Sequence, residues 1–353
     1  MREQDISSEL QERVIAAGRG NTPLVIRGGD SKAFYGREAS GEWLDVSQHA
    51  GIINYEPTEL VITARAGTPL AVIEHTLASR QQMLPFEPPH YGGNATLGGT
   101  IACNLSGPRR AYAGAARDFV LGCKILNGKG EILSFGGEVM KNVAGYDVSR
   151  LMAGAMGTLG ILLEVSLKVL PLPESEITLT HPIDLSRALK KIHRIAQFDR
   201  PVSATCFDGD TLYIRLSGSE GAVSAGRQAI GGDALGADQA FWHRLKEQRH
   251  GFFTSEQPLW RLSVASDTPP MALDGKWLYE WGGALRWLIS NAAANHVQAA
   301  AESAGGHASC FRRRQQHDVF HPLPAALMAI HKKLKHAFDP QHILNRGRMY
   351  PEI

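Results

Sequence analysis

The stretch GGNATLGGTIACNLSGPRR, Gly92–Arg110, decides how the rest of the chain is interpreted. Two glycine pairs, Gly92-Gly93 and Gly98-Gly99, stand among threonines, an asparagine and apolar residues, and two arginines end the stretch. Glycine has no Cβ, so another group can approach its backbone closely. The stretch is too glycine-rich to predict an ordinary helix and too apolar to predict a flexible linker. We therefore expect a backbone that a ligand approaches closely.

The polar residues of this stretch, with a second glycine-rich segment downstream, outline a candidate ligand-binding site. Hydroxyl and amide side chains can bond to phosphate oxygens or to the polar edge of a ring, and arginine can meet a diphosphate. The segment AGAMGTLGI, Ala153–Ile161, repeats the pattern later in the chain. Two such segments in one domain predict an extended ligand between strands. The candidates are Thr96, Gly98, Gly99, Thr100, Asn104, Ser106, Gly107, Arg117, Asp118, Gly157, Gly160 and Ile161.

A turn with an anion-binding pattern follows the first predicted strand, Leu24–Ile26. Two glycines there leave several backbone N–H groups unobstructed, and such a nest suits a phosphate. A plain tight turn is the alternative. The chain has neither a GxxxxGK[ST] loop nor a GxGxxG fingerprint after a strand, so a P-loop or Rossmann nucleotide site is not expected. The candidates in this turn are Arg27, Gly28, Gly29, Asp30, Ser31 and Lys32.

The composition is that of a globular protein with no electrostatic preference for nucleic acid. Of 353 residues, 43% are hydrophobic and 20% charged, and the formal net charge is +2. This balance excludes the strongly basic class that binds nucleic acid or an anionic membrane surface. The four cysteines form no CxxC pair, which predicts a reducing compartment and no ferredoxin-type iron–sulfur cluster within this chain.

The hydropathy pattern predicts no direct membrane insertion. The first residues, MREQDISSEL, lack the apolar core of a signal peptide. No uninterrupted apolar run approaches the roughly 20 residues that a spanning helix needs. We expect a cytoplasmic protein, with partner subunits as the route to any peripheral position at the inner membrane.

The order of the expected elements indicates an α+β fold rather than a regular βαβ alternation. Before residue 90, four short strands lie between two helices, Ser8–Ala17 and a second one that Thr68 can cap. The dipeptide Asn127-Gly128 between apolar runs predicts a hairpin, and a long apolar strand follows and ends at Pro171. A change of character beyond this proline marks a domain boundary. The expected divisions are 1–173, 174–322 and 323–353.

The second division also mixes helices with strands. Asp184 is placed to cap a helix there, and TLYIRLSG and LWRLSVAS predict strands. The last division begins with a predicted helix, Ala325–Phe338, and ends in a polar tail.

Two long segments resemble a known family. TLGGTIACNLSGPRRAYAGAARDFVLGCKILNGKGEILSFGG and MKNVAGYDVSRLMAGAMGTLGILLEVSLKVLP are similar to the FAD-binding domain typified by vanillyl-alcohol oxidase and p-cresol methylhydroxylase (the PCMH type). The closing FDPQHILNRGRMY resembles the C-terminal signature of the 2-hydroxy-acid branch of that family. The resemblance extends over nearly the whole chain. It implies a two-subdomain FAD-binding domain at 1–173, a smaller α+β cap or substrate domain, and a tail that returns to the flavin domain.

The resemblance also implies how FAD is held. In this family FAD lies extended between two subdomains. The turn Arg27–Lys32 is expected to hold the pyrophosphate, and Thr96–Gly107 to line the flavin and its ribityl chain. Gly157–Ile161 is expected to pack on the dinucleotide through its backbone. Asn345 and Arg348 are expected to return to the flavin.

The chain departs from the family pattern in three places. Members that bind FAD covalently often carry histidine in the glycine turn, and Asp30-Ser31 follow the glycines here, so we expect non-covalent FAD. The C-terminal motif usually reads Asn-Pro-Gly, whereas this chain has Asn345-Arg346-Gly347, which predicts a less rigid loop. Catalytic members carry an HAGDGNLH-like motif, and SAGGHASCF here has His307 alone.

The resemblance implies an FAD-dependent oxidoreductase subunit that acts on a small 2-hydroxy acid. The expected reaction is the two-electron oxidation of glycolate to glyoxylate, with electrons passed to partner subunits. The resemblance implies a larger catalytic flavoprotein subunit and an iron–sulfur subunit as those partners. The incomplete histidine motif keeps an alternative open, which is a non-catalytic assembly subunit with the same fold.

The sequence does not identify a catalytic residue. Three side chains remain as candidates: His307, Arg286 and His90. No metal site is expected. The histidines and cysteine that are grouped near the C-terminus do not have a standard zinc-site spacing. That group is His307, Cys310, His317 and His321.

Overall fold

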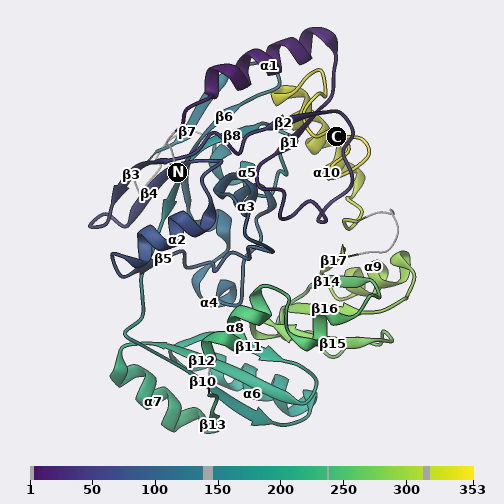
Figure 1. The fold of residues 1–353 in the computed structure, drawn as a ribbon. Coiled ribbons are helices and arrows are strands. Elements are labelled where there is room, and N and C mark those ends of the chain that lie inside the picture. Colours follow the sequence, from purple (N-terminus) through teal and green to yellow (C-terminus); the bar gives the residue numbers. More distant parts are fainter. Residues whose placement is uncertain (1–3, 138–145, 237, 313–318) are drawn as a thin grey trace. The chain divides into compact units, whose positions relative to one another are not determined.

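A computed structural model of the chain describes residues 4–137, 146–236, 238–312 and 319–353. The chain divides into two compact units, whose elements are labelled in Figure 1. Unit 1 comprises Met1–Leu105, Ala115–Pro171 and Pro322–Ile353, and unit 2 comprises Ser106–Gly114 and Leu172–His321. The passage of Ser106–Gly114 into unit 2 has no counterpart in the sequence-based division, which keeps residues 1–173 together.

Unit 1 is built on a five-stranded antiparallel sheet of order β3-β4-β8-β6-β7. It also holds a parallel pair, β1-β2, and a short antiparallel pair, β5-β9. The predicted strands before residue 65 and the predicted hairpin are confirmed. The strands are β1 (Leu24–Arg27), β2 (Glu42–Asp45), β3 (Ile52–Glu56), β4 (Val61–Arg65), β5 (Gln82–Met83), β6 (Val120–Leu126), β7 (Ile132–Gly136), β8 (Ile161–Lys168) and β9 (Leu170–Pro171).

The helices described in unit 1 are α1 (Ser7–Gly20), α2 (Leu70–Ala78), α3 (Leu97–Cys103), α5 (Val148–Met152) and α10 (Ala325–Phe338), with a 3₁₀ turn η1 (Ala116–Phe119). Helix α1, drawn in purple in Figure 1, buries Leu10 and Val14 in a core cluster with residues of β1, β2 and β8. Ile343 and Leu344 belong to the same cluster. This core therefore joins the first strands of the chain to its C-terminal segment.

The stretch expected to be too glycine-rich for an ordinary helix forms one in part, α3, so that expectation was wrong. The side chain of Thr96 caps the helix by accepting a hydrogen bond from the Gly99 N–H at 3.3 Å. Asn104 ends it with a left-handed φ of 51°. The glycines serve close packing, because a Cβ at Gly98 would lie 2.7 Å from the Cβ of Ala66. The cap and this packing outweigh the low helix propensity of two glycines.

Thr68 does not cap α2, contrary to the expectation from the sequence. The residue that precedes the helix is Pro69, and no side chain caps it. The Thr68 hydroxyl instead accepts from the Gly51 N–H at 2.9 Å and donates to the Gly51 carbonyl at 3.1 Å. The threonine therefore joins the start of α2 to the residue before β3.

Unit 2 contains an eight-stranded sheet of order β13-β10-β12-β11-β15-β16-β14-β17. The predicted Asp184 cap of α6 is confirmed here, as is the predicted final helix of the chain in unit 1. The strands of unit 2 are β10 (Ser175–Pro182), β11 (Val202–Phe207), β12 (Thr211–Gly218), β13 (Asp233–Ala234), β14 (Leu259–Ser263), β15 (Lys276–Glu280), β16 (Leu285–Ile289) and β17 (His307–Arg312). Its helices are α4 (Arg110–Ala113), α6 (Leu185–Ala196), α7 (Glu220–Ile230), α8 (Asp238–Lys246) and α9 (Ala294–Ser303), with 3₁₀ turns η2 (Gly251–Thr254) and η3 (Trp281–Gly283).

The two faces of the unit 2 sheet differ in character. Buried residues of α6, α7 and α9 pack on one face, against side chains such as Ile214 in β12 and Leu262 in β14. Side chains alternate along a strand, so the residues between these lie on the other face. They include Arg215, Arg261 and His307. One face of the sheet is therefore the core of unit 2, and the other, which we call the polar face, carries charged groups.

A buried histidine beside β3 makes the stability of unit 1 depend on pH. His49 is 1% exposed, and its Nδ1 accepts a hydrogen bond from the Ile6 N–H at 3.2 Å. Burial lowers the pKa of His49 below its usual 6.5, although the nearby carboxylate of Asp5 opposes the shift. As the pH falls below 6.5, the unfolded chain binds a proton that folded His49 does not bind. The contribution of neutral His49 to the free energy of unfolding is therefore present at neutral pH. It is lost as the pH falls from 6.5 toward the lowered pKa of His49.

We expect the His49→Gln variant to lose less stability than the parent chain when the pH is lowered from neutral to mildly acidic. The difference in slope approaches about 1.4 kcal/mol per pH unit, the value for one proton. Urea unfolding at several pH values measures this slope for both proteins. The effects of the other histidines on the slope cancel, because both proteins share those residues. Equal slopes would show that the pKa of His49 does not change on folding.

Candidate functional site

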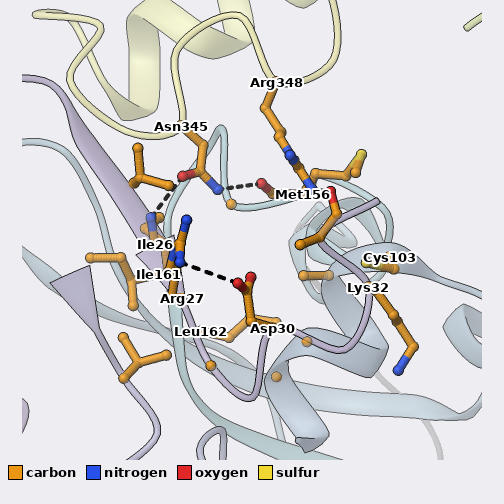
Figure 2. A pocket seen from close by; sticks show the side chains of 18 of the residues that line it. Ile26, Arg27, Asp30, Lys32, Cys103, Met156, Ile161, Leu162, Asn345 and Arg348 are labelled. Carbon is orange, nitrogen blue, oxygen red and sulfur yellow. Dashed lines mark hydrogen bonds and ion pairs between the residues drawn. The ribbon is translucent and has the colours of Figure 1, made fainter. Parts of the chain in front are cut away.

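Unit 1 contains a cavity of about 370 Å³ that gathers residues chiefly from four separate segments of the chain. Figure 2 shows side chains of its wall. The segments are β1 with the turn after it, helix α3, the glycine-rich loop before β8, and the C-terminal segment. Fourteen of the predicted site residues line it: Arg27, Gly28, Gly29, Asp30, Ser31, Lys32, Thr96, Gly98, Gly99, Gly157, Gly160, Ile161, Asn345 and Arg348.

The turn after β1 is packed so tightly that its glycines cannot be replaced without movement. A Cβ at Gly29 would lie 1.3 Å from the backbone oxygen of Asn94, and one at Gly28 would lie 2.7 Å from the Thr96 hydroxyl. Asp30 has a left-handed φ of 58°. The turn therefore keeps one shape, which presents backbone to the cavity at its glycines. Such a surface suits an anionic group that bonds to N–H donors.

Two cations flank this turn in different ways. Arg27 pairs with Asp30 at 3.2 Å, drawn as a dashed line in Figure 2, and its guanidinium lies 3.5 Å from the centre of the Trp43 ring. Lys32 is only 6% exposed. Its ammonium lies 3.4 Å from the Ser31 hydroxyl, which is longer than an ordinary N–H···O bond. The ammonium lies equally far, 3.4 Å, from the His90 carbonyl, so it is a buried cation beside the turn.

Asn345 fixes the opposite wall of the cavity. Figure 2 shows its amide between two backbone segments: Oδ1 accepts from the Ile26 N–H at 2.8 Å, and Nδ2 donates to the Met156 carbonyl at 2.7 Å. A Cβ at Gly157 would lie 2.6 Å from that same amide nitrogen. The side chain is 7% exposed. One amide therefore sets the spacing between β1 and the glycine-rich loop.

Arg348 ties the C-terminal segment to the loop after the glycine turn. Its guanidinium donates to the carbonyls of Arg37, Ala33 and Tyr35 at 2.7, 3.0 and 2.7 Å. The sequence predicts a less rigid loop at Asn345-Arg346-Gly347. In the structure its first residue, Asn345, is held by hydrogen bonds, and so is Arg348, the residue that follows the segment. The contacts of Asn345 and Arg348 restrain this segment in the absence of a proline.

A buried ion pair supports the same wall from behind. Lys335 in α10 and Asp339 are both fully buried, and their charged groups lie 2.7 Å apart. The Lys335 ammonium also donates to the Thr158 carbonyl at 2.8 Å and to the Leu344 carbonyl at 2.7 Å. Burial lowers the pKa of Lys335, and the charge of Asp339 opposes this shift. The carboxylate of Asp339 in turn accepts from the N–H groups of Ile343 and Leu344.

The chain is similar to several known proteins, one of them over its whole length. Residues 6–136 match the family described as "FAD binding domain". The glycolate oxidase subunit GlcE of Escherichia coli (strain K12) is 51% identical over 353 residues, which is 100% of both chains. The chain belongs to the family of this glycolate oxidase subunit. Its fold is of the PCMH type, and its cofactor domain is an FAD-binding domain.

Other relatives match only in part. The glycolate oxidase subunit GlcD of Bacillus subtilis (strain 168) is 30% identical over 175 residues, which is 49% of this chain and 37% of that protein. The D-2-hydroxyglutarate dehydrogenase of Xanthomonas citri pv. viticola is 35% identical over 130 residues, 36% of this chain and 27% of that protein. A solved alkyldihydroxyacetonephosphate synthase has a TM-score of 0.68 at 14% identity, over 96% of this chain and 75% of that one. This last likeness concerns the fold alone.

Six predicted site residues do not line the cavity of unit 1. Thr100 lies inside α3, and Asn104 ends that helix and accepts from the Arg117 N–H at 3.1 Å. Arg117 and Asp118 form a largely exposed pair at 3.8 Å. The other two, Ser106 and Gly107, belong to unit 2. Glycine and hydroxyl content in the sequence did not distinguish these positions from those of the cavity wall.

The three candidate catalytic side chains have different surroundings. His90 bonds to the carboxylate of Glu74 at 2.8 Å. Arg286 is fully buried on the helix-covered face of the unit 2 sheet, where its guanidinium donates to three backbone carbonyls, those of Gly283, Thr268 and Pro269. Arg286 therefore supports the loop between β14 and β15, which contains Thr268 and Pro269. His307 begins β17 on the opposite, polar face.

The structure describes no metal-binding group. Among residues 4–137, 146–236, 238–312 and 319–353 there is no cluster of three or more histidine, cysteine or acidic side chains able to hold a metal ion. His317, from the group considered in the sequence, lies outside these residues. Over the same part of the chain, no helix has the length and hydropathy required to span a bilayer.

Some residues of the cavity wall could not be recognised from the sequence. Lys335 and Asp339, which support the wall, have an ordinary sequence context, and only their burial reveals them. Others line the cavity from helix α3, from α5 and the loop after it, and from the loop before β2: Cys103, Met152, Met156, Glu38, Ala39 and Ser40. The glycine-rich segment around Met156 was the available signal for part of this set.

Proposed function

We propose that this chain is the FAD-binding subunit of a glycolate oxidase complex. It takes part in the two-electron oxidation of glycolate to glyoxylate, and the electrons pass to partner subunits. The observation that carries the proposal is the cavity of unit 1, whose glycine turn, buried Lys32 and amide-fixed wall suit a nucleotide diphosphate. The full-length similarity to a glycolate oxidase subunit supports the choice of reaction.

Separate parts of the cavity wall suit separate parts of FAD. The N–H groups of the Arg27–Lys32 turn and the Lys32 ammonium would bind the diphosphate. The backbone of Gly157–Ile161 would contact the nucleotide, and Gly98 and Gly99 of α3 leave room beside it. When bound, FAD supplies the acceptor for the hydride that leaves the substrate carbon.

We infer that FAD is bound without a covalent link. The turn after β1 carries no histidine, and the one thiol of the described cavity wall belongs to Cys103. Burial raises the pKa of Cys103, and the cations Lys32 and Arg348 only partly oppose this. The thiol therefore stays protonated near neutral pH, and a protonated thiol is a poor nucleophile.

An absorption spectrum of the purified full-length chain tests the cofactor. We expect flavin bands near ~450 nm that move to the supernatant after acid precipitation. The Lys32→Met variant should bind FAD about 10-fold more weakly or worse, since a charge-assisted bond is worth about 1.5–3 kcal/mol. Lys129→Met, an exposed lysine in the β6–β7 turn, is the matched control and should bind as the parent does. Flavin retained in the pellet, or equal binding by both variants, would contradict the assignment.

The partners are part of the proposal. We infer a larger catalytic flavoprotein subunit and an iron–sulfur subunit. Glycolate gives up two electrons and two protons when it becomes glyoxylate, and turnover continues only if those electrons leave this subunit. The four cysteines of this chain form no CxxC pair to hold a cluster, and three of them are buried on separate strands. We therefore assign the next electron carrier to another protein.

A non-catalytic assembly subunit is the second candidate, and the single His307 of the SAGGHASCF segment favours it. The two candidates differ in the assembled complex. If electrons pass through this chain, a complex that carries Lys32→Met loses glycolate oxidation together with flavin from this subunit. If the chain only supports assembly, that complex keeps its activity.

A further inference from the structure

We propose that unit 2 binds a small carboxylate at a site formed by Arg261 and His307 next to Trp281, with Arg110 adding positive charge. The site stands on the polar face of the unit 2 sheet, and all four residues belong to that unit. That the carboxylate is the 2-hydroxy acid itself rests on the proposed function. The existence of the site rests on the geometry below.

The indole of Trp281 forms a fixed base for the site. It is 3% exposed, and its Nε1 donates to the Gly107 carbonyl at 3.0 Å. Two guanidinium groups are attracted to this one ring: the Cζ of Arg110 lies 4.4 Å from its centre and that of Arg261 5.1 Å. The ring therefore holds both arginines in place.

The strand register brings His307 to the same face as Arg261. In the β14–β17 pair Arg261 stands opposite Ser309, and Ser263 stands opposite His307. Residues two apart on a strand share a face, so these four side chains form one patch of two strands. The patch combines a guanidinium, an imidazole and two hydroxyl groups. These are donors of the kind that bind a carboxylate.

The neighbouring charges that act on His307 within the described residues are all positive. Partial desolvation lowers the pKa of His307, and the neighbouring side chains of Arg261, His321 and Arg110 lower it further. Arg261 is half-buried, and no ion pair involves it among the residues that the structure describes. A cluster of like charges is unfavourable by itself, and a bound anion would relieve it.

A carboxylate suits this cluster better than a phosphate. The strong donors of the patch are one planar guanidinium and one imidazole, which match the two oxygens of a carboxylate. A phosphate is instead typically held by converging backbone N–H groups, such as those of the turn in unit 1. Arg261 and His307 stand on paired strands, whose backbone groups bond to each other. None of the proposed residues lines the cavity of unit 1.

Calorimetric titration of the full-length, FAD-loaded chain with oxalate tests the proposal. Oxalate carries two carboxylates and cannot be oxidised by loss of a hydride, so binding is measured without turnover. We expect binding in the millimolar range or tighter, about 10-fold weaker in Arg261→Gln and weaker in His307→Gln. Arg187→Gln, an arginine with a 77% exposed side chain on α6, is the control and should bind as the parent does. Sodium chloride at equal ionic strength should not compete.

Two results would overturn the site: no binding of oxalate, or equal binding by Arg261→Gln and Arg187→Gln. Circular dichroism of each variant checks that it folds. The flavin spectrum of the same samples separates this inference from the proposed function. If FAD is absent yet oxalate binds in the expected order, the proposed function fails and the carboxylate site stands. If FAD is bound and oxalate is not, the reverse holds.

Discussion

The Lys335→Met variant is expected to lose about 3–5 kcal/mol of the free energy of unfolding, because it leaves the Asp339 carboxylate buried without its partner. It also leaves the carbonyls of Thr158 and Leu344 without the donor they share. A typical domain is stable by only about 5–15 kcal/mol, so a large part of the margin is lost. The loss should be evident as a lower midpoint of urea unfolding.

The exposed Lys332, one turn earlier on α10, provides the matched control. Lys332→Met makes the same chemical change at the surface, where substitutions usually stay within about 0.5 kcal/mol. Asp339→Leu should destabilise as strongly as Lys335→Met, and the double variant should cost less than the sum of the two. Additive losses would mean that the two charges do not stabilise each other. A Lys335→Met protein as stable as Lys332→Met would refute the role of the pair.

The Gly29→Ala variant is expected to weaken FAD binding by at least about 10-fold while the chain remains folded. Its Cβ would lie 1.3 Å from the Asn94 oxygen, a backbone atom that cannot rotate away, so the turn itself must move. Overpacking of this kind usually costs about 1–3 kcal/mol, and here the displaced atoms are those that would meet the diphosphate. Quenching of flavin fluorescence on titration with FAD gives the dissociation constant.

Neighbouring glycines provide a graded comparison for this experiment. A Cβ at Gly28 would meet the Thr96 hydroxyl, a side-chain atom that can rotate, so Gly28→Ala should lie between parent and Gly29→Ala. A Cβ at Gly93 would meet no atom within 4 Å, so Gly93→Ala should bind FAD as the parent does. Equal dissociation constants for the Gly29 and Gly93 variants would show that the turn does not contact the cofactor.

Local patterns in the sequence predict much of the fold but only part of the site. The strand and turn at Leu24–Lys32, the hairpin at Asn127 and the helix Ala325–Phe338 follow from short-range rules, and the structure confirms them. The helix α3 was missed because its glycines were weighed by propensity alone. What makes it a helix is the Thr96 cap and contact with Ala66, and that contact is a tertiary one.

Contacts over long sequence separations hold other parts of the wall. Asn345, which the family resemblance alone indicated, bonds to Ile26, 319 residues away, and Lys335, which nothing indicated, bonds to Thr158, 177 residues away. Nothing in the local pattern of α10 distinguishes Lys335 from its neighbour Lys332, because burial is decided by the segments that pack around it. Only positions whose role depends on nearby residues could be predicted with this kind of reasoning.

The split of unit 1 along the chain bears on how the protein is made. A ribosome releases the turn after β1 early and the glycine-rich loop midway, and then all of Leu172–His321 before α10 emerges. Domains of a growing chain can fold as they appear, so the sheet of unit 2 can form while the Ile26 N–H and the Met156 carbonyl still await Asn345. The wall of the cavity is therefore complete only at the end of synthesis, and the FAD that we propose it holds would be captured last.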